Sequence, residues 1–444
     1  MLRVAVVGSG PSGVYTAQSL VQQDPEVRVD VLDRLPCPYG LVRYGVAPDH
    51  EKIKSLQRNL RTVLEHERVR FLGGVTVGAG GVGVDRLREL YHAVVYCVGA
   101  SADRRLGIPG EDLPGSRSAT EFVSWYSAHP DTVTDGFVRG ARSAVVIGVG
   151  NVAVDVTRIL ARGAAELSPT DMPEAALTAL AGSEITEISM VGRRGPSQAR
   201  FTTKELRELG ALPDTDVIVD EAELALDPAY RDPSGLPPAQ RRNVEVLRAW
   251  TALPHPGVRR RIRLRFFLRP AELLSDGGRV GAVRCERTVP DGHGGVTGTG
   301  RFEDVGAQLV LRSVGYLGVP LEGLPFDAER GTVPQRDGRV QREGAVAPGE
   351  YVAGWIKRGP TGVIGTNRPC AKETAAALLA DGPALLSRPV PDDALPLLRE
   401  AGVEPVGWDG WLAIERAEAA LGASLGRGVV KLPDWAALWA AAGR

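Results

Sequence analysis

The feature that most constrains this chain is a glycine-rich turn that occurs twice, each time after an apolar strand and before a helical pattern. The first turn, residues 8–13, has the sequence G-S-G-P-S-G, and the second, residues 148–153, has G-V-G-N-V-A. In such a turn the glycines allow a tight bend, close approach of a pyrophosphate, and close packing of helix on strand. The helix N-terminus presents free N–H groups and its positive dipole end to the phosphates. The repeat therefore predicts two dinucleotide-binding units.

Further strand candidates alternate with helical segments, which predicts an α/β fold with parallel sheets and helices on both faces. The second glycine turn lies inside the chain rather than after a finished first domain. We therefore expect two Rossmann-like dinucleotide-binding domains, with residues 105–318 inserted into a discontinuous domain of residues 1–104 and 319–444. The tail from Pro389 onward is helical and tryptophan-rich, and we interpret it as structural packing. The strand candidates are 2–7, 27–32, 93–98, 143–147, 187–191, 261–268, 308–313 and 351–353.

An acidic residue follows the first turn at the spacing that a ribose requires. Asp33 ends the second strand, about 20 residues beyond the glycines. A carboxylate there can accept hydrogen bonds from ribose hydroxyls, and it repels a 2′-phosphate. The first unit is therefore predicted to bind FAD or NAD rather than NADP.

The second turn differs from the first at the third glycine position and at the end of the following strand. Ala153 stands at the third glycine position, and the strand at 187–191 is followed by Gly192, Arg193 and Arg194 instead of an acid. Two guanidinium groups at a strand end match a 2′-phosphate. At about 1.5–3 kcal/mol for each charge-assisted contact, they would favour NADPH over NADH by two or more orders of magnitude. Two such sites imply a relay in which hydride passes from the nicotinamide to the flavin.

Composition and spacing argue against several other classes. The formal net charge is −1, so no overall field favours nucleic acid or an acidic membrane. Apolar runs such as residues 93–100 are far shorter than the roughly 18 residues of a membrane span, and residues 2–7 do not resemble a signal peptide. We therefore expect a cytoplasmic protein. Because its four cysteines form no C-x-x-C pair and its six histidines lack metal-ligand spacing, we expect no disulfide framework and no metal site.

Four longer segments extend the pattern beyond the glycine turns. Residues 38–50 have the sequence P-Y-G-L-V-R-Y-G-V-A-P-D-H, and residues 191–196 have V-G-R-R-G-P. Residues 201–209 have F-T-T-K-E-L-R-E-L, and residues 354–366 have G-W-I-K-R-G-P-T-G-V-I-G-T. In this order they resemble the adrenodoxin-reductase-type ferredoxin–NADP reductases. The resemblance implies an inserted NADP domain, FAD and NADP as cofactors, and single-electron transfer to a small acidic iron–sulfur protein.

The resemblance also implies particular contacts. It favours a monomeric protein. It also makes a cytochrome P450 a candidate acceptor of electrons from the iron–sulfur protein. Two positions depart from the family pattern: Asp33 stands where glutamate is common, and Val149 replaces a polar residue. Together with the first turn, the FAD candidates are Gly8, Gly10, Ser12, Gly13, Asp33, Leu41, Val77, Trp355, Gly362, Val363 and Ile364. The NADP candidates are Gly150, Asn151, Val152, Arg193, Arg194, Glu205 and Gly362.

Two further sets of residues have candidate roles. His50 and Glu208 lie in family-like segments, and we interpret them as groups that tune the site electrostatically or carry a proton, with plain packing as the alternative. Arg241 and Arg242 precede a strand whose arginines alternate with apolar residues, and we expect these two to dock an acidic ferredoxin. The strand arginines, including Arg261 and Arg263, are interpreted as a solvated face.

Three other functions remain as alternatives. A flavin electron-input subunit of a larger, glutamate-synthase-like complex is the main one, although such chains usually carry extra iron–sulfur cysteines. An NADPH-dependent flavin monooxygenase is less consistent with the sequence, and a non-catalytic flavin sensor is a further class. A disulfide reductase is not supported, because it needs a cysteine pair beside the flavin.

Overall fold

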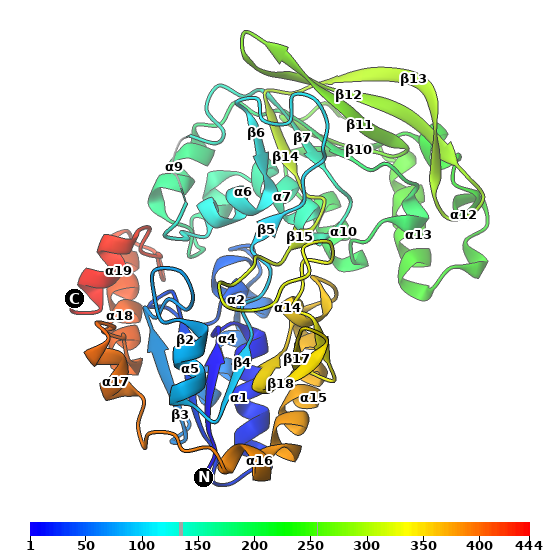
Figure 1. The fold of residues 1–444 in the computed structure, drawn as a ribbon. Helices are drawn as coiled ribbons and strands as arrows, with labels where there is room; N and C mark the ends of the chain where they lie inside the picture. The colour runs from blue at the N-terminus through cyan, green and yellow to red at the C-terminus, as the bar shows by residue number, and fades with distance from the viewer. Residues whose placement is uncertain (133–135, 255) are drawn as a thin grey trace. The chain divides into compact units, whose positions relative to one another are not determined.

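The computed structural model describes residues 1–132, 136–254 and 256–444, and the chain divides into two compact units. Unit 1 comprises Met1–Ala102 and Gly315–Arg444, and unit 2 comprises Asp103–Val314. Figure 1 follows the chain from the blue N-terminus through green, in unit 2, to the red C-terminus. Two short strands, β5 (Ala102–Asp103) and β15 (Tyr316–Leu317), form a small sheet of their own.

Unit 1 is built on a seven-stranded sheet of order β16-β17-β18-β4-β1-β2-β3. The strands from β18 to β3 are parallel neighbours, and β17 and β16 continue the sheet antiparallel. The strands are β1 (Arg3–Val7), β2 (Arg28–Asp33), β3 (Val69–Gly73), β4 (Ala93–Tyr96), β16 (Gln335–Arg336), β17 (Arg339–Arg342) and β18 (Ala345–Val352).

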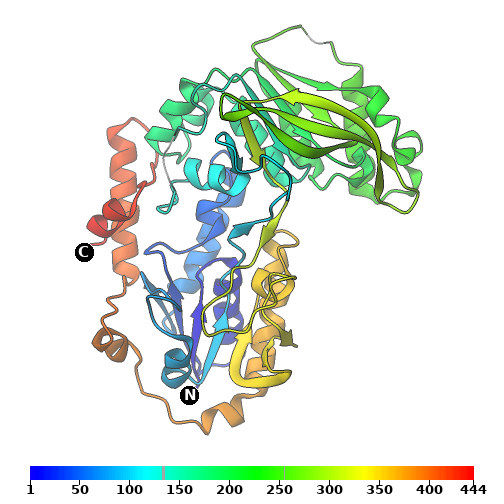
Figure 2. The same cartoon turned by 45° about the horizontal axis from the view of Figure 1, so that its top comes forward.

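Side chains of β1 alternate between two buried clusters, because successive residues of a strand point to opposite faces. Val4 and Val6 pack on one face, and Ala5 and Val7 on the other. On the first face α1 (Pro11–Gln23) and α15 (Asn367–Ala380) lie side by side, as Figures 1 and 2 show. The other helices of unit 1 are α2 (Leu41–Tyr44), α3 (Glu51–Lys54), α4 (Leu56–Leu64), α5 (Val84–Leu90), α14 (Trp355–Arg358), α16 (Gly382–Leu386), α17 (Leu395–Glu400), α18 (Trp408–Ser424) and α19 (Trp435–Ala441).

Unit 2 is built on a six-stranded parallel sheet of order β6-β14-β7-β8-β10-β9. Its strands are β6 (Ser116–Ser118), β7 (Ser143–Ile147), β8 (Glu187–Val191), β9 (Thr215–Val219), β10 (Arg260–Arg265) and β14 (Leu309–Arg312). Its helices are α6 (Ala119–Tyr126), α7 (Asn151–Ala161), α8 (Ala164–Leu167), α9 (Glu174–Ala181), α10 (Thr203–Gly210), α11 (Glu221–Leu224), α12 (Pro228–Arg231) and α13 (Pro238–Thr251).

The second face of the unit 2 sheet differs from the sequence expectation. Instead of helices, it packs against an antiparallel sheet of β11 (Leu268–Asp276), β12 (Arg279–Pro290) and β13 (Val296–Gly306), seen beside β10 in Figure 1. Apolar residues of β11 and β12 such as Leu273 and Val283 supply this cover. The strand expected at 261–268 ends at Arg265, because Phe267 takes a positive φ of 56° and the chain turns there into β11.

The C-terminal tail packs on unit 1, as the tryptophan pattern indicated. Trp411 of α18 is 1% exposed and meets Tyr39 edge-on, with ring centroids 5.8 Å apart. Trp435 and Trp439 of α19 stack on each other. Within the described ranges, no helix is both long and apolar enough to cross a membrane.

Candidate functional site: two glycine turns

The first glycine turn joins β1 to α1 in unit 1. Gly10 is the N-cap of α1 and Pro11 its first residue, and no side chain of the described residues caps the helix. Its first N–H groups therefore remain available to an anion. A Cβ at Gly13 would lie 1.8 Å from the carbonyl oxygen of Gly8, so helix and strand approach more closely than any larger residue allows.

Asp33 ends β2 and contacts this turn directly. Its Oδ2 accepts hydrogen bonds from the Ser9 N–H at 2.8 Å and the Ser9 hydroxyl at 2.5 Å, and its Oδ1 accepts from the Leu35 N–H at 2.9 Å. Burial raises the pKa of Asp33, and the hydrogen bonds from Ser9 and Leu35 oppose that shift. Each carboxylate oxygen has more than one lone pair, so the group retains capacity for a ribose hydroxyl.

The remaining FAD candidates belong to unit 1, and several are adjacent to the turn. A Cβ at Gly354 would lie 2.3 Å from the Ser12 hydroxyl, which places the start of α14 against α1. Leu41 and Val363 are 41% and 60% exposed, so both side chains are free to contact a ligand. Trp355 stacks on Tyr316, and its buried indole N–H has no hydrogen-bond partner among the described residues. Val77 is buried with Ile356, and Ile364 is half-buried.

These observations fit a bound flavin dinucleotide. The uncapped helix and glycine turn suit a pyrophosphate, and the exposed aliphatic side chains suit the apolar ring system. The indole N–H of Trp355 offers a donor that the described part of the protein does not use.

The second glycine turn joins β7 to α7 in unit 2. Gly150 is the N-cap of α7, again with no capping side chain in the described chain. Ala153 is fully buried, so this turn accommodates a Cβ that the first turn does not. The Asn151 side-chain oxygen accepts from the Thr202 N–H at 2.8 Å, which fixes the turn to the segment before α10. Val152 is half-buried against the core of unit 2.

Three arginines lie beside this turn, two of them directly after β8 and the third, Arg200, farther along the chain. Arg193 is exposed, Arg194 is half-buried, and the N–H of Arg200 donates to the carbonyl of Val149 in the turn at 2.8 Å. The pKa of Arg194 is lowered by burial first and then by the positive charges of Arg193 and Arg200. In the described residues none of the three forms an ion pair with a carboxylate. Sequence reasoning missed Arg200, whose only signal was its place shortly after the Arg193–Arg194 pair.

The last NADP candidate of unit 2 is Glu205 of α10, which is buried. It is 8% exposed, and one of its carboxyl oxygens is buried without a hydrogen-bond partner in the described chain. An unsatisfied acceptor is costly unless a ligand supplies the donor, as ribose or amide groups can. The arginine cluster and Glu205 therefore fit a phosphorylated dinucleotide. Gly362, expected to contact both cofactors, belongs to unit 1.

His50 and Glu208 lie in different units. His50 is 6% exposed and is the N-cap of α3, where its carbonyl accepts the N–H groups of Ile53 and Lys54. Glu208 of α10 lies 3.4 Å from a guanidinium nitrogen of the fully buried Arg158 and 3.5 Å from the ammonium of Lys204.

The arginine pair with the candidate docking role and the strand arginines have different surroundings. Arg241 and Arg242 are exposed on α13, and Arg241 donates to the carbonyls of Ser234 and Leu236. On β10, Arg261 and Arg263 both pair with Glu187, which neutralises part of the cationic face.

The four thiols of this chain are buried and form no disulfide in the structure. Burial raises the pKa of Cys37 to about 11 and the pKa of Cys97 to about 12, so both stay protonated at neutral pH. Across residues 1–132, 136–254 and 256–444, no group of three or more potential ligands could hold a metal ion.

Comparison with known proteins adds to this geometry. The family model described as pyridine nucleotide-disulphide oxidoreductase matches residues 2–195. The mitochondrial NADPH:adrenodoxin oxidoreductase of Arabidopsis thaliana is 40% identical over 99% of this chain and 95% of the plant protein. The NADPH-ferredoxin reductase FprA of Mycobacterium tuberculosis H37Rv is 47% identical over 85% of this chain and 83% of its own length. A solved structure of M. tuberculosis FprA in complex with NADPH superimposes with a TM-score of 0.94, at 43% identity and full coverage of both chains.

Proposed function

The chain belongs to the adrenodoxin-reductase-type ferredoxin–NADP reductases, and on that premise we propose which of its residues carry each part of the reaction. It is an FAD-dependent oxidoreductase that passes electrons from NADPH to an iron–sulfur protein of the ferredoxin type. When bound, FAD accepts hydride from the nicotinamide and releases electrons one at a time. The protein's own residues bind and orient the two dinucleotides and shield them from water.

Unit 1 is proposed to bind FAD. The N-terminus of α1 and the turn at Gly8, Gly10, Ser12 and Gly13 take the pyrophosphate, and Asp33 accepts from the ribose. The other assigned contacts are Leu41, Val77, Trp355, Gly362, Val363 and Ile364. We propose domain limits of 1–104 and 319–444 for FAD and 105–318 for NADP, which differ from the boundaries of the two units by two residues at the first crossing and four at the second.

Unit 2 is proposed to bind NADPH. The observation that carries this assignment is the cluster of Arg193, Arg194 and Arg200 beside an uncapped helix N-terminus. Three cations without a carboxylate partner in the described chain form a site for a group with close to two negative charges. The other assigned contacts are Gly150, Asn151, Val152, Glu205 and, from unit 1, Gly362.

We propose an electrostatic role for Glu208, because two cations already occupy its surroundings. For His50 we propose either electrostatic tuning or passage of a proton between the flavin and solvent. The pH profile of flavin reduction in His50→Gln distinguishes these roles. A rate equal to that of the parent at every pH would contradict proton transfer through His50.

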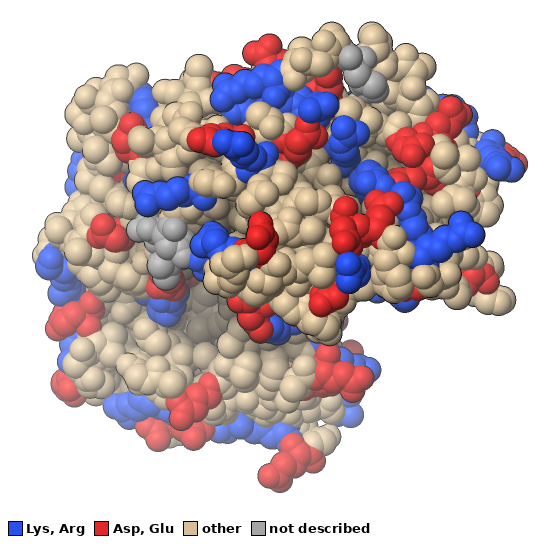
Figure 3. All heavy atoms as spheres, turned by 90° about the horizontal axis from the view of Figure 1, so that it is seen from above, with Lys and Arg blue, Asp and Glu red and all other residues tan. Residues whose placement is uncertain are grey.

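Docking of the iron–sulfur partner is proposed at Arg241 and Arg242 on α13. On the face that Figure 3 shows, lysine and arginine side chains are interspersed with aspartate and glutamate, so a basic docking surface must be local. Reversing both charges to glutamate is expected to slow ferredoxin reduction at low salt and to leave flavin reduction by NADPH unchanged. Equal ferredoxin reduction by the variant would refute the site. A monomeric state and a downstream cytochrome P450 are further proposals from the family resemblance, and a cytoplasmic location is a further proposal from the sequence.

An anaerobic titration of the purified flavoprotein with NADPH and then NADH tests the assignment of the two units. Rapid bleaching of the flavin absorbance with a strong NADPH preference is the expected result. An equal response to NADH would show that the arginine cluster does not select for the 2′-phosphate. Absence of bound flavin would refute the FAD site in unit 1.

A further inference from the structure

The segment that carries Arg193 and Arg194 is fixed through its backbone. The carbonyl of Gly192 accepts from the Leu268 N–H at 3.0 Å, and the carbonyl of Arg194 accepts from the Phe267 N–H at 3.3 Å. The N–H of Gly192 donates to the carbonyl of Arg265 at 2.9 Å. The chain between β10 and β11 thus holds both sides of this segment.

The remaining carbonyl, that of Arg193, is held by a side chain from β12. The Thr288 hydroxyl donates to it at 2.8 Å, across 95 positions of sequence. Thr288 is 1% exposed, and its own N–H donates to the Phe267 carbonyl at 2.9 Å. It lies at an irregularity in the pairing of β12 with β13, where the bulged strand can direct a side chain out of the regular ladder. One threonine therefore connects the antiparallel sheet to the arginine segment.

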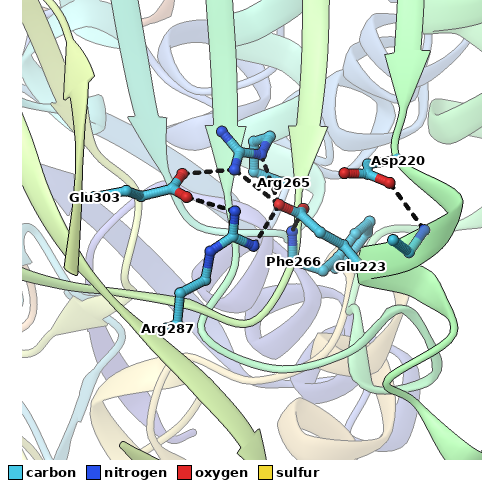
Figure 4. A network of polar contacts seen from close by, with 7 residues as sticks. Asp220, Glu223, Arg265, Phe266, Arg287 and Glu303 are labelled. Atoms are coloured by element: carbon cyan, nitrogen blue, oxygen red, sulfur yellow. Dashed lines mark hydrogen bonds and ion pairs between the residues drawn. The ribbon is translucent and has the colours of Figure 1, made fainter. Parts of the chain in front are cut away.

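A network of charged residues, here called the Glu223 network, fixes this junction. It consists of Glu223, Arg265, Arg287 and Glu303, and Figure 4 shows the two arginines between the two carboxylates. One oxygen of Glu223 accepts from Arg265 at 2.7 Å and from Arg287 at 2.7 Å, and the other accepts from the Phe266 N–H at 2.9 Å. Glu303 of β13 pairs with both arginines.

The position of each partner explains what the network can do. Phe266 immediately precedes Phe267, the residue of positive φ at which the chain turns into β11. Arg287 immediately precedes Thr288. Glu223 is 4% exposed in its side chain, so its charge is buried and compensated by the two guanidinium groups. Since breaking one partner of such a group leaves an uncompensated charge, the arrangement resists displacement. The network therefore locks both elements that hold the arginine segment.

We infer that the β11–β13 sheet sets the preference for the phosphorylated nicotinamide dinucleotide, with Thr288 as the positioning residue. Its hydroxyl holds the Arg193 carbonyl and thereby fixes the direction in which the two guanidinium groups leave the backbone. This inference rests on the proposed role of Arg193 and Arg194 in binding the 2′-phosphate. Thr288 does not itself contact the dinucleotide in this scheme.

The test is a set of substitutions in the FAD-loaded full-length protein. Thr288→Val keeps the shape of the side chain and removes the donor, Thr288→Ser keeps the donor, and Thr288→Ala removes the donor with the least steric demand. Thr251→Val is the control, because the Thr251 hydroxyl also donates to a backbone carbonyl of unit 2, that of Arg248 in α13, at 2.8 Å, and this bond lies outside the β11–β13 sheet and the Glu223 network. Calorimetry measures the dissociation constants of 2′,5′-ADP and of 5′-ADP, a pair of ligands that differ only in the 2′-phosphate.

Thr288→Val is expected to weaken 2′,5′-ADP binding about fivefold, the factor typical of one lost hydrogen bond, and to leave 5′-ADP binding unchanged. Thr288→Ser is expected to restore the parent ratio of the two constants, and Thr251→Val to leave it unaltered. A ratio in Thr288→Val, or in Thr288→Ala should the valine variant not accumulate, that stays within twofold of the parent would overturn the inference.

A second variant separates this result from failure of the proposed function. The double substitution Arg193→Ala and Arg194→Ala must collapse the ratio if these arginines bind the 2′-phosphate at all. If it does and the Thr288 variants do not, only the positioning role is wrong. If it does not, the proposed phosphate site is wrong and the positioning role is refuted with it.

Discussion

The two glycine turns have a similar backbone conformation, but an acidic residue lies beside the first and arginines lie beside the second. In each, a strand enters a glycine of positive φ, 109° at Gly8 and 138° at Gly148. A Cβ there would lie 2.5 Å from the carbonyl of Cys97 in the first turn and 2.2 Å from the carbonyl of Ser313 in the second. In both turns a glycine is the N-cap of the following helix. The shared backbone suits a pyrophosphate at either turn.

The differences lie at the third small residue and at the end of the neighbouring strand. Gly13 has no room for a Cβ, whereas Ala153 carries one. Asp33 is hydrogen-bonded into the first turn, whereas Arg194 beside the second is surrounded by other arginines. Under the proposed assignments, the turn binds the pyrophosphate that both dinucleotides share, and the adjacent strand end distinguishes one dinucleotide from the other.

The largest expected effect comes from exchanging the third small residue between the turns. Gly13→Ala places a Cβ 1.8 Å from a backbone carbonyl that cannot move without opening the turn, so we expect loss of FAD. Ala153→Gly needs no such movement and should cost about 0.5–1 kcal/mol in helix stability, with NADPH binding retained. Flavin content after gel filtration and thermal unfolding measure both. Full flavin content in Gly13→Ala would show that the two turns tolerate the same residues.

The next largest effect is expected at the strand end of unit 2. Arg193→Ala combined with Arg194→Ala removes two charge-assisted contacts worth about 1.5–3 kcal/mol each, so NADPH affinity should fall by roughly 100-fold or more. NADH affinity should stay the same, since NADH lacks the 2′-phosphate. Stopped-flow flavin reduction at varied NADPH and NADH gives both constants. A parallel loss for both nucleotides would mean that the arginines support the fold instead of reading the phosphate.

A smaller effect is expected at the strand end of unit 1. Asp33→Asn leaves one side-chain acceptor in place of two and removes the charge, so FAD affinity should fall about tenfold. Asp33→Glu, which restores the carboxylate on a longer arm, should recover most of it. Reconstitution of the apoprotein, followed by quenching of flavin fluorescence, measures these affinities. The preference of Asp33→Asn for NADPH over NADH serves as the control. It should not change, because the residues assigned to that preference belong to unit 2.

The sequence predicts the motifs that lie close to these turns along the chain. It does not predict contacts between residues that are far apart in the chain. The glycine turns, Asp33 and the arginine pair are readable because each motif lies within a few residues of a strand end. The contact of Thr288 with Arg193 joins residues 95 positions apart, and no spacing rule predicts it. A guanidinium–carboxylate pair between Arg43, in the family-like segment 38–50, and Glu418 of the tail spans 375 positions. The tryptophan pattern therefore predicts only packing for the tail, and it does not reveal that the tail also holds segment 38–50.

One missed element did leave a local signal. Gly277 and Gly278 separate β11 from β12, and both take positive φ, 56° and 80°. A Gly-Gly pair between two strands is a recognised hairpin turn. The antiparallel sheet of unit 2 was thus predictable in part, but the face it covers was not, because helices and sheets bury similar apolar residues.

The smallest expected effect concerns the strands against which the two glycine turns pack. The first turn meets uncharged Cys97, whereas the second meets Ser313, whose neighbour Arg312 donates to the buried Glu111 at 2.6 Å. Burial alone would raise the pKa of Glu111, but the N–H groups of Leu106 and Gly107 and the Arg312 guanidinium outweigh it and lower the pKa below 4.5. A carboxyl with a folded-state pKa below its unfolded value stabilises the fold at higher pH, and this contribution disappears as pH falls through the folded-state pKa.

Glu111→Gln should therefore destabilise unit 2 by about 1 kcal/mol at neutral pH, and by progressively less as the pH is lowered below 4.5. Thermal unfolding of the parent and the variant across this pH range measures the difference. Glu89→Gln in unit 1 is the control, since Glu89 is 65% exposed in its ion pair with Arg86 and should change stability little at any pH. A loss in Glu111→Gln that is the same at every pH would assign the effect to packing and not to charge. In that case the charge difference between the two turns would be confined to Asp33 and the arginine cluster, and the strands behind them would be equivalent.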